Sequence, residues 1–133
     1  MKILTKSDIK SLSSLRIKKY RLEMDIFVAE GEKIVKELIK SDLKINKIIA
    51  TEQWYATNYQ KIENYDNICY IINRKDLDRI SSLTTPQEVL AIVEKPTYSY
   101  DLKLLKNELV IALDSIQDPG NMGTIIRLAD WFG

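Results

Sequence analysis

The amino-acid sequence predicts an α/β layer fold. The main observation is that short apolar segments of strand length alternate with longer segments of helical periodicity. The composition agrees, because 45% of the residues are hydrophobic and 29% are charged, as is normal for a soluble globular protein. With 133 residues, the chain has room for one ordinary hydrophobic core and little more.

The first predicted helix begins near Ser7, whose hydroxyl can cap the amino terminus, and runs to about Leu22. The apolar residues on one side of it are Ile9, Leu12, Leu15 and Leu22. A short strand follows at residues 27–29, and helical spacing returns in Ile34, Val35, Leu38 and Ile39.

The middle of the chain continues the alternation. The predicted strands are residues 45–50, 69–72 and 89–93, and the predicted helices are residues 52–64 and 75–82. Pro86 and Pro96 bound the last of these strands. Residues 96–107 have little periodicity, and we interpret them as a linker.

The last part of the chain predicts a strand, a polar turn and a helix. Val110 to Leu113 form an apolar run that predicts a buried strand, and the turn holds Asp118-Pro119-Gly120-Asn121-Met122-Gly123. Gly120 and Gly123 permit backbone shapes and close approaches that a side chain would block. Such a loop lies at the carboxyl end of a sheet, where α/β proteins usually bind ligands.

Charge and residue usage exclude several function classes. The net charge is +1, so there is no global basic field, and the chain has no His and one Cys, Cys69. A structural zinc site and a histidine general base are therefore not expected, and a single Cys fits a reducing cytoplasm. No apolar run approaches the roughly 20 residues of a membrane-spanning helix, so we expect no membrane association.

The turn and the helix after it closely resemble the first signature of the SpoU (TrmH-like) RNA ribose methyltransferases, which belong to the knotted SPOUT superfamily. The matching residues are Leu113, Asp114, Ile116, Asp118, Pro119, Asn121, Gly123, Ile126, Arg127, Ala129, Phe132 and Gly133. One departure is Leu128, where many members carry Thr.

The front of the chain resembles the substrate-binding domain of that family. The resemblance rests on residues 16–38, on Ile48 to Ala50 and on residues 84–94, with Glu88 where members often have Gly. It implies a three-layer α/β/α sandwich similar to ribosomal and kink-turn-binding proteins. The implied organisation is an RNA-binding domain at residues 1–95, the linker at 96–107, and the truncated start of a SPOUT domain at 108–133.

The resemblance implies transfer of a methyl group from S-adenosylmethionine to a ribose 2′-hydroxyl of structured RNA, either ribosomal or transfer RNA. In the family, the cofactor pocket is built from a second and a third motif, so this chain is expected to lack the cofactor site and to be inactive alone. A homodimer is expected for the full-length protein. The alternative is a stand-alone RNA-binding module without catalysis.

Arg127 and Asn121 are the predicted catalytic residues. Arg127 lies four residues after Gly123, about one helical turn away, so its guanidinium can reach the turn and grip a phosphate bidentately. In the family this Arg is credited with activating the ribose hydroxyl. A guanidinium hardly ever loses its proton, so stabilising the developing alkoxide is the more consistent role. Asn121 is expected to support Arg127 and the ribose, and it can also cap the helix.

Lys10, Lys18, Lys19 and Arg21 are the predicted RNA-binding residues. Residues 1–24 carry seven Lys or Arg against two acids, and Lys10, Lys18 and Arg21 share one side of the predicted helix. A solvated helix face is the equally weighted alternative. The aromatic residues able to stack on bases are Tyr20, Trp54, Tyr55 and Tyr59, although helical spacing favours a place in the core.

Overall fold

The computed structural model describes residues 2–99, 101, 103, 106 and 109–133. The chain divides into two compact units, Met1–Thr97 and Tyr98–Gly133. The predicted linker at residues 96–107 lies partly outside the described residues.

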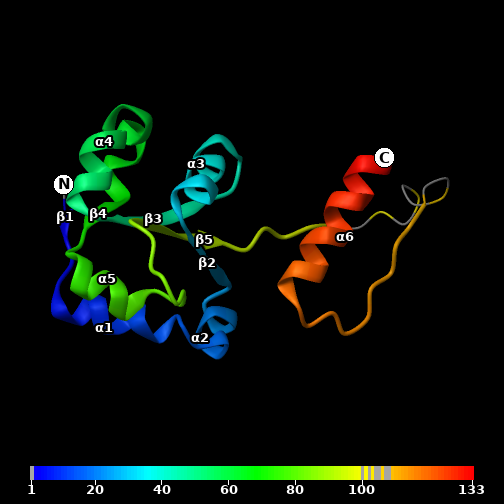
Figure 1. Cartoon of the computed structure of the whole chain (residues 1–133), viewed down its shortest axis with the longest axis horizontal. Helices are drawn as coiled ribbons and strands as arrows, with labels where there is room; N and C mark the ends of the chain where they lie inside the picture. The colour runs from blue at the N-terminus through cyan, green and yellow to red at the C-terminus, as the bar shows by residue number, and fades with distance from the viewer. Residues whose placement is uncertain (1, 100, 102, 104–105, 107–108) are drawn as a thin grey trace. The chain divides into compact units, whose positions relative to one another are not determined.

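The first unit contains a mixed five-stranded sheet in the order β1-β4-β3-β5-β2 (Figure 1). Its strands are β1 (Lys2–Ile3), β2 (Ile26–Glu30), β3 (Ile45–Ala50), β4 (Cys69–Ile71) and β5 (Val89–Glu94). β4 runs parallel to both β1 and β3, whereas β5 is antiparallel to both β3 and β2. β3 therefore has a hydrogen-bonded neighbour on each side, with Ile48 opposite both Cys69 and Ala91.

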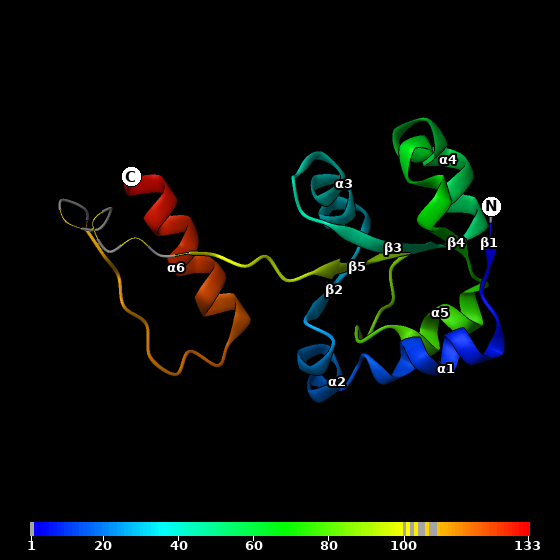
Figure 2. The ribbon, with the colours of Figure 1, turned by 180° about the vertical axis from the view of Figure 1, so that it is seen from behind.

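Helices cover both faces of this sheet, so the predicted α/β/α sandwich is confirmed (Figures 1 and 2). The helices are α1 (Lys6–Ser14), α2 (Lys18–Glu23), α3 (Glu32–Lys40), α4 (Glu52–Ile62), the 3₁₀ helix η1 (Glu63–Ile68) and α5 (Arg74–Ile80). Residues of α3 and α4 bury against one face, and residues of α1 and α5 bury against the other. The two sides of the sheet therefore carry separate apolar clusters.

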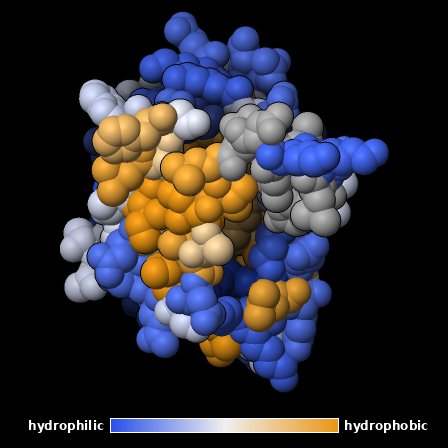
Figure 3. All heavy atoms as spheres, turned by 90° about the vertical axis from the view of Figure 1, so that its right-hand side faces the viewer, coloured by the Kyte–Doolittle hydropathy of each residue, from blue (hydrophilic) through white to orange (hydrophobic). Residues whose placement is uncertain are grey.

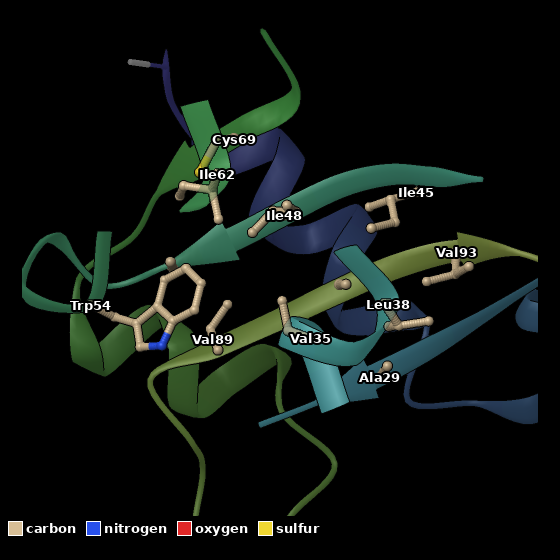
Figure 4. Close-up of a cluster of buried hydrophobic side chains, with 12 residues drawn as sticks. Ala29, Val35, Leu38, Ile45, Ile48, Trp54, Ile62, Cys69, Val89 and Val93 are labelled. Carbon is tan, nitrogen blue, oxygen red and sulfur yellow. The ribbon is translucent and has the colours of Figure 1, made fainter. Parts of the chain in front are cut away.

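β3 contributes to both clusters. Ile48 packs with Val35, Leu38 and Trp54 on the α3–α4 side (Figure 4), and Ile49 packs on the α1–α5 side. Both side chains are 0% exposed. Successive strand residues point to opposite faces, so a strand buried on both faces becomes a continuous apolar run.

The predicted single helix from Ser7 to Leu22 is wrong. The cap is Thr5, which exchanges hydrogen bonds with Asp8 in a capping box, and α1 ends at Ser14 before α2 begins at Lys18. The serines near the break form local hydrogen bonds to α1, since the Ser13 and Ser14 hydroxyls donate to the Lys10 and Ser11 carbonyls. Such bonds offer the backbone an alternative to a continued helix.

The second unit contains α6 (Pro119–Phe132), which confirms the predicted helix. The predicted buried strand at Val110–Leu113 is wrong, because this run is not in a strand and Val110 and Ile111 are 54% and 52% exposed. Among the described residues of this unit, no strand pairs with it. Leu128, Trp131 and Phe132 of α6 are also exposed. The face drawn in Figure 3 has a patch of apolar atoms near its centre.

Two further observations concern the cysteine and the helix lengths. Cys69 is a buried free thiol. Throughout the described stretches of the chain, each helix is too short or too polar to cross a bilayer.

Candidate functional site

The polar segment at residues 118–123 is the start of a helix. Asp118 is the cap residue of α6: its Oδ1 accepts the backbone N–H of Asn121 at 2.7 Å, and Pro119 occupies the first turn. Gly120 and Gly123 lie inside α6 and neither has a positive φ, so the special backbone shapes expected of them are absent. The non-glycine residue with positive φ in this unit's described part is Ser115, at 55°.

Arg127 lies back over the first turns of α6, as its spacing from Gly123 predicts. Its Nη2 donates to Thr124 Oγ1 at 3.2 Å, and a Cβ placed on Gly123 would sit 3.8 Å from Nη1. The Thr124 hydroxyl in turn donates to the Gly120 carbonyl at 2.9 Å. The side chain is exposed, so an anion can reach its guanidinium.

Asn121 is exposed at the start of the same helix, but it does not share a face with Arg127. The two residues are six positions apart, so their side chains leave the helix about 120° from each other. Asn121 does not cap α6, because Asp118 does. Both predicted catalytic residues therefore lie on one helix, on neighbouring faces rather than side by side.

The predicted basic surface near the amino terminus is divided between two helices. Arg21 donates from Nη1 to the carbonyls of Leu15 and Arg16, so its guanidinium stabilises the junction between α1 and α2. Lys19 forms an exposed ion pair with Glu23 at 3.8 Å. The common helix side expected for Lys10, Lys18 and Arg21 does not exist, because the helix is broken between them.

A groove of about 840 Å³ lies at the sheet edge where α4 and α5 begin. Its lining includes Thr51, Glu52, Arg74 and Glu88. The Glu88 carboxylate accepts hydrogen bonds from Thr51 Oγ1 at 2.6 Å and from Arg74 Nη1 at 3.0 Å. Glu88 thus links three elements of the fold, and the groove has an acidic character.

A second groove, of about 550 Å³, lies between α3 and α4, and sequence reasoning missed it. Its charged lining residues are Lys33, Lys36, Glu37, Lys40 and Lys61. The signal for one wall was present, because Lys33, Lys36 and Lys40 have i, i+3, i+7 spacing on one helix. The opposite wall comes from α4, and its position follows from the tertiary fold rather than from local spacing.

The aromatic residues have mixed positions. Trp54 is 4% exposed and belongs to the core, as its spacing favoured. Tyr55 stacks edge-on with Tyr59, with ring centroids 5.6 Å apart. The Tyr55 hydroxyl donates to Asp66 Oδ1, and this bond, with burial and the Asp66 charge, raises the pKa of Tyr55 to about 12.

Residues 6–91 match the family model of the MRM3-like substrate-binding domain. The chain belongs to this family. The match covers most of the first unit, including α3, α4 and the strands β2 to β4.

Curated relatives extend the likeness into α6. The chain is 30% identical over 125 residues to the 23S rRNA (guanosine(2553)-2′-O)-methyltransferase RlmP of Bacillus subtilis, covering 94% of this chain and 48% of that protein. It is 26% identical over 125 residues to the mitochondrial rRNA methyltransferase 3 of Xenopus laevis, covering 90% of this chain and 30% of that protein. The chain thus spans about half or less of the length of these relatives.

Solved structures agree. An AdoMet-bound rRNA methyltransferase from Sinorhizobium meliloti has a TM-score of 0.71 at 32% identity, over 98% of this chain and 49% of that one. A TrmH-family protein from Porphyromonas gingivalis has a TM-score of 0.68 at 33% identity, over 98% of this chain and 50% of that one. The resemblance to TrmH/SpoU proteins, first seen in the residues of the α6 segment, is confirmed.

Proposed function

We propose that this chain provides the RNA-binding unit and the first catalytic helix of an enzyme that methylates a ribose 2′-hydroxyl of ribosomal RNA. The observation that carries the proposal is the match of residues 6–91 to the MRM3-like substrate-binding domain, and Arg127 beside Gly123 on α6 supports it. Residues 1–95 form the RNA-binding domain, residues 96–107 the linker, and residues 108–133 the beginning of the methyltransferase domain.

Arg127 binds the phosphate next to the target ribose and stabilises negative charge on the 2′-oxygen as the hydroxyl loses its proton. A guanidinium keeps its own proton, so it acts by donating hydrogen bonds. Thr124 orients it by accepting one N–H at 3.2 Å, which leaves the other donors for RNA. Asn121 contacts the RNA from the neighbouring face of α6.

The methyl donor is S-adenosylmethionine, which supplies an electrophilic methyl group on a sulfonium. The rRNA methyltransferase from Sinorhizobium meliloti is bound to AdoMet, and this chain spans 49% of that protein. We assign the cofactor site to the second and third family motifs, which are not among these 133 residues. These 133 residues alone are therefore inactive. We further propose that the complete enzyme is a homodimer and that it acts in the cytoplasm.

Lys10, Lys18 and Lys19 add phosphate contacts that give affinity without sequence readout. Arg21 is not assigned such a contact, because its guanidinium already binds the Leu15 and Arg16 carbonyls.

The test is ribose-methylation mapping of ribosomal and transfer RNA from a strain that lacks the gene. We expect one ribosomal site to lose its methyl group and to regain it when the wild-type gene is restored. A loss confined to transfer RNA would reassign the substrate. Unchanged methylation in both RNA classes would contradict the enzyme and favour a non-catalytic RNA-binding module.

A further inference from the structure

The groove between α3 and α4 has basic walls. Lys33, Lys36 and Lys40 of α3 line one wall, and Lys61 of α4 belongs to the other. Glu37 is the acidic residue in the lining. Three lysines with i, i+3, i+7 spacing project from one side of a helix, so their ammonium groups form a row along the groove.

The lysines differ in how far they are already paired. Lys36 forms an ion pair with Glu32, and Lys40 pairs with Glu37 at 3.1 Å. Across the described residues, no ion pair involves Lys33 or Lys61, although, after the larger effect of Lys36, the Lys61 charge helps to lower the pKa of the Glu32 carboxyl. The groove therefore holds more positive charge than its carboxylates neutralise, and an anionic partner restores the balance.

The floor of the groove is largely apolar and is fixed in place. Its buried residues include Trp54, Ile62 and the polar Asn58, which are 4%, 1% and 5% exposed. The Trp54 indole N–H donates to Glu32 Oε2 at 3.2 Å, and Asn58 Nδ2 donates to the Trp54 carbonyl at 3.0 Å. A floor held by these bonds needs little ordering when a ligand binds, which favours affinity.

The α3–α4 groove and the larger groove at the sheet edge have lining residues of opposite net charge. At the sheet edge the charged lining is Glu52, Glu88 and Arg74, and the Arg74 guanidinium is already bound to Glu88 and to the Pro86 carbonyl. With Glu88 paired to Arg74, the lining keeps one net negative charge, and its described residues offer no free cation to a phosphate. Charge complementarity with RNA therefore favours the α3–α4 groove.

We propose that the α3–α4 groove binds a strand of the substrate RNA. The lysines of both walls contact successive phosphates, and the ribose and base between them pack over the apolar floor. A positively charged groove that follows the phosphate backbone is typical of sites for single-stranded nucleic acid. The inference rests on the proposed function, because that function supplies RNA as the partner.

The test measures binding of the 133-residue chain to a protein-free 23S rRNA transcript over a range of salt concentrations. The groove variant replaces Lys33, Lys40 and Lys61 with Ala. It keeps Lys36, because Lys36 pairs with Glu32, which accepts the hydrogen bond from Trp54. We expect affinity to fall at least about tenfold and the slope of log K against log salt to flatten by roughly 2, about 0.7 for each lost phosphate contact.

Two matched variants control this measurement. Replacing Lys6, Lys75 and Lys95 with Ala removes the same charge from parts of the first unit outside the groove lining, and we expect less than a threefold change in affinity. Replacing Lys33, Lys40 and Lys61 with Arg keeps the charge, and we expect near wild-type affinity and slope. Circular dichroism melting confirms that each variant is folded.

The outcomes separate this inference from the proposed function. If the wild-type chain binds the transcript and the groove variant matches the Lys75 control, the groove is not the RNA site, although RNA binding stands. If the wild-type chain binds no RNA, both proposals fail. If the groove variant loses binding to polyglutamate but keeps RNA binding, the groove takes an acidic protein instead.

Discussion

Two apolar segments of this chain have similar composition and opposite surroundings. Ile48, Ile49 and Ala50 of β3 are 0% exposed and lie between β4 and β5. Val110 and Ile111 of the second unit are 54% and 52% exposed, with no strand beside them in the described part of that unit. An apolar run becomes a buried strand only where neighbours supply both hydrogen bonds and a packing surface.

The largest expected effect is a loss of stability on substitution in β3. Ile48→Ala removes a fully buried side chain from the α3–α4 cluster, and the cavity should lower the free energy of unfolding by about 2–5 kcal/mol. The matched change Ile111→Ala should lie within about 0.5 kcal/mol of wild type, because it leaves no cavity. Urea denaturation followed by circular dichroism measures both. Equal effects would show that the second unit has a core of its own.

The contrast also explains which parts of the fold could be predicted. Strand β3 has the predicted bounds, because its apolar residues Ile48 to Ala50 are buried on both faces and Ile45 marks its start. β1, only Lys2–Ile3, is too short to carry a pattern. At the break between α1 and α2, Arg21 reaches back to the Leu15 carbonyl, a contact that no periodicity reveals.

The candidate sites follow the same rule. The closeness of Arg127 to Gly123 follows from helix geometry alone and was predictable. The α3–α4 groove was not, since Lys40 and Lys61 are brought to one groove by the packing of two helices on the sheet. Local spacing is written in the sequence, whereas the pairing of distant elements depends on the whole fold.

The second expected effect concerns the exposed unit, where a substitution should alter catalysis rather than stability. Arg127→Lys in the full-length enzyme keeps the charge but loses the planar fork. Losing a donor aimed at transition-state charge should reduce turnover about 10²–10³-fold. Single-turnover methyl transfer with saturating RNA and S-adenosylmethionine measures it, and RNA affinity is the control. Weaker binding with normal turnover would make Arg127 a docking residue only.

A smaller effect compares the helix caps of the two units. Thr5 caps α1 inside the packed unit, so Thr5→Ala should cost about 1 kcal/mol of unfolding free energy. Asp118 caps α6, whose apolar residues are exposed, so Asp118→Ala should reduce helical circular dichroism and leave the urea midpoint of the first unit unchanged. A shifted midpoint for Asp118→Ala would show that the two units unfold together.

The last prediction uses Cys69 as a reporter of the packed unit. Burial, followed by the nearby Asp66 charge, raises the pKa of the Cys69 thiol from 9.0 to about 11. Because the folded pKa is the higher one, the stability gained from the neutral thiol is complete below about pH 9 and declines as the pH rises toward about 11. At about pH 8, alkylation of Cys69 should therefore proceed only through opening of the sheet. We expect Ile48→Ala to accelerate alkylation and Ile111→Ala to leave its rate unchanged. Rapid alkylation of the wild-type thiol at that pH would show that β4 opens without unfolding of the unit.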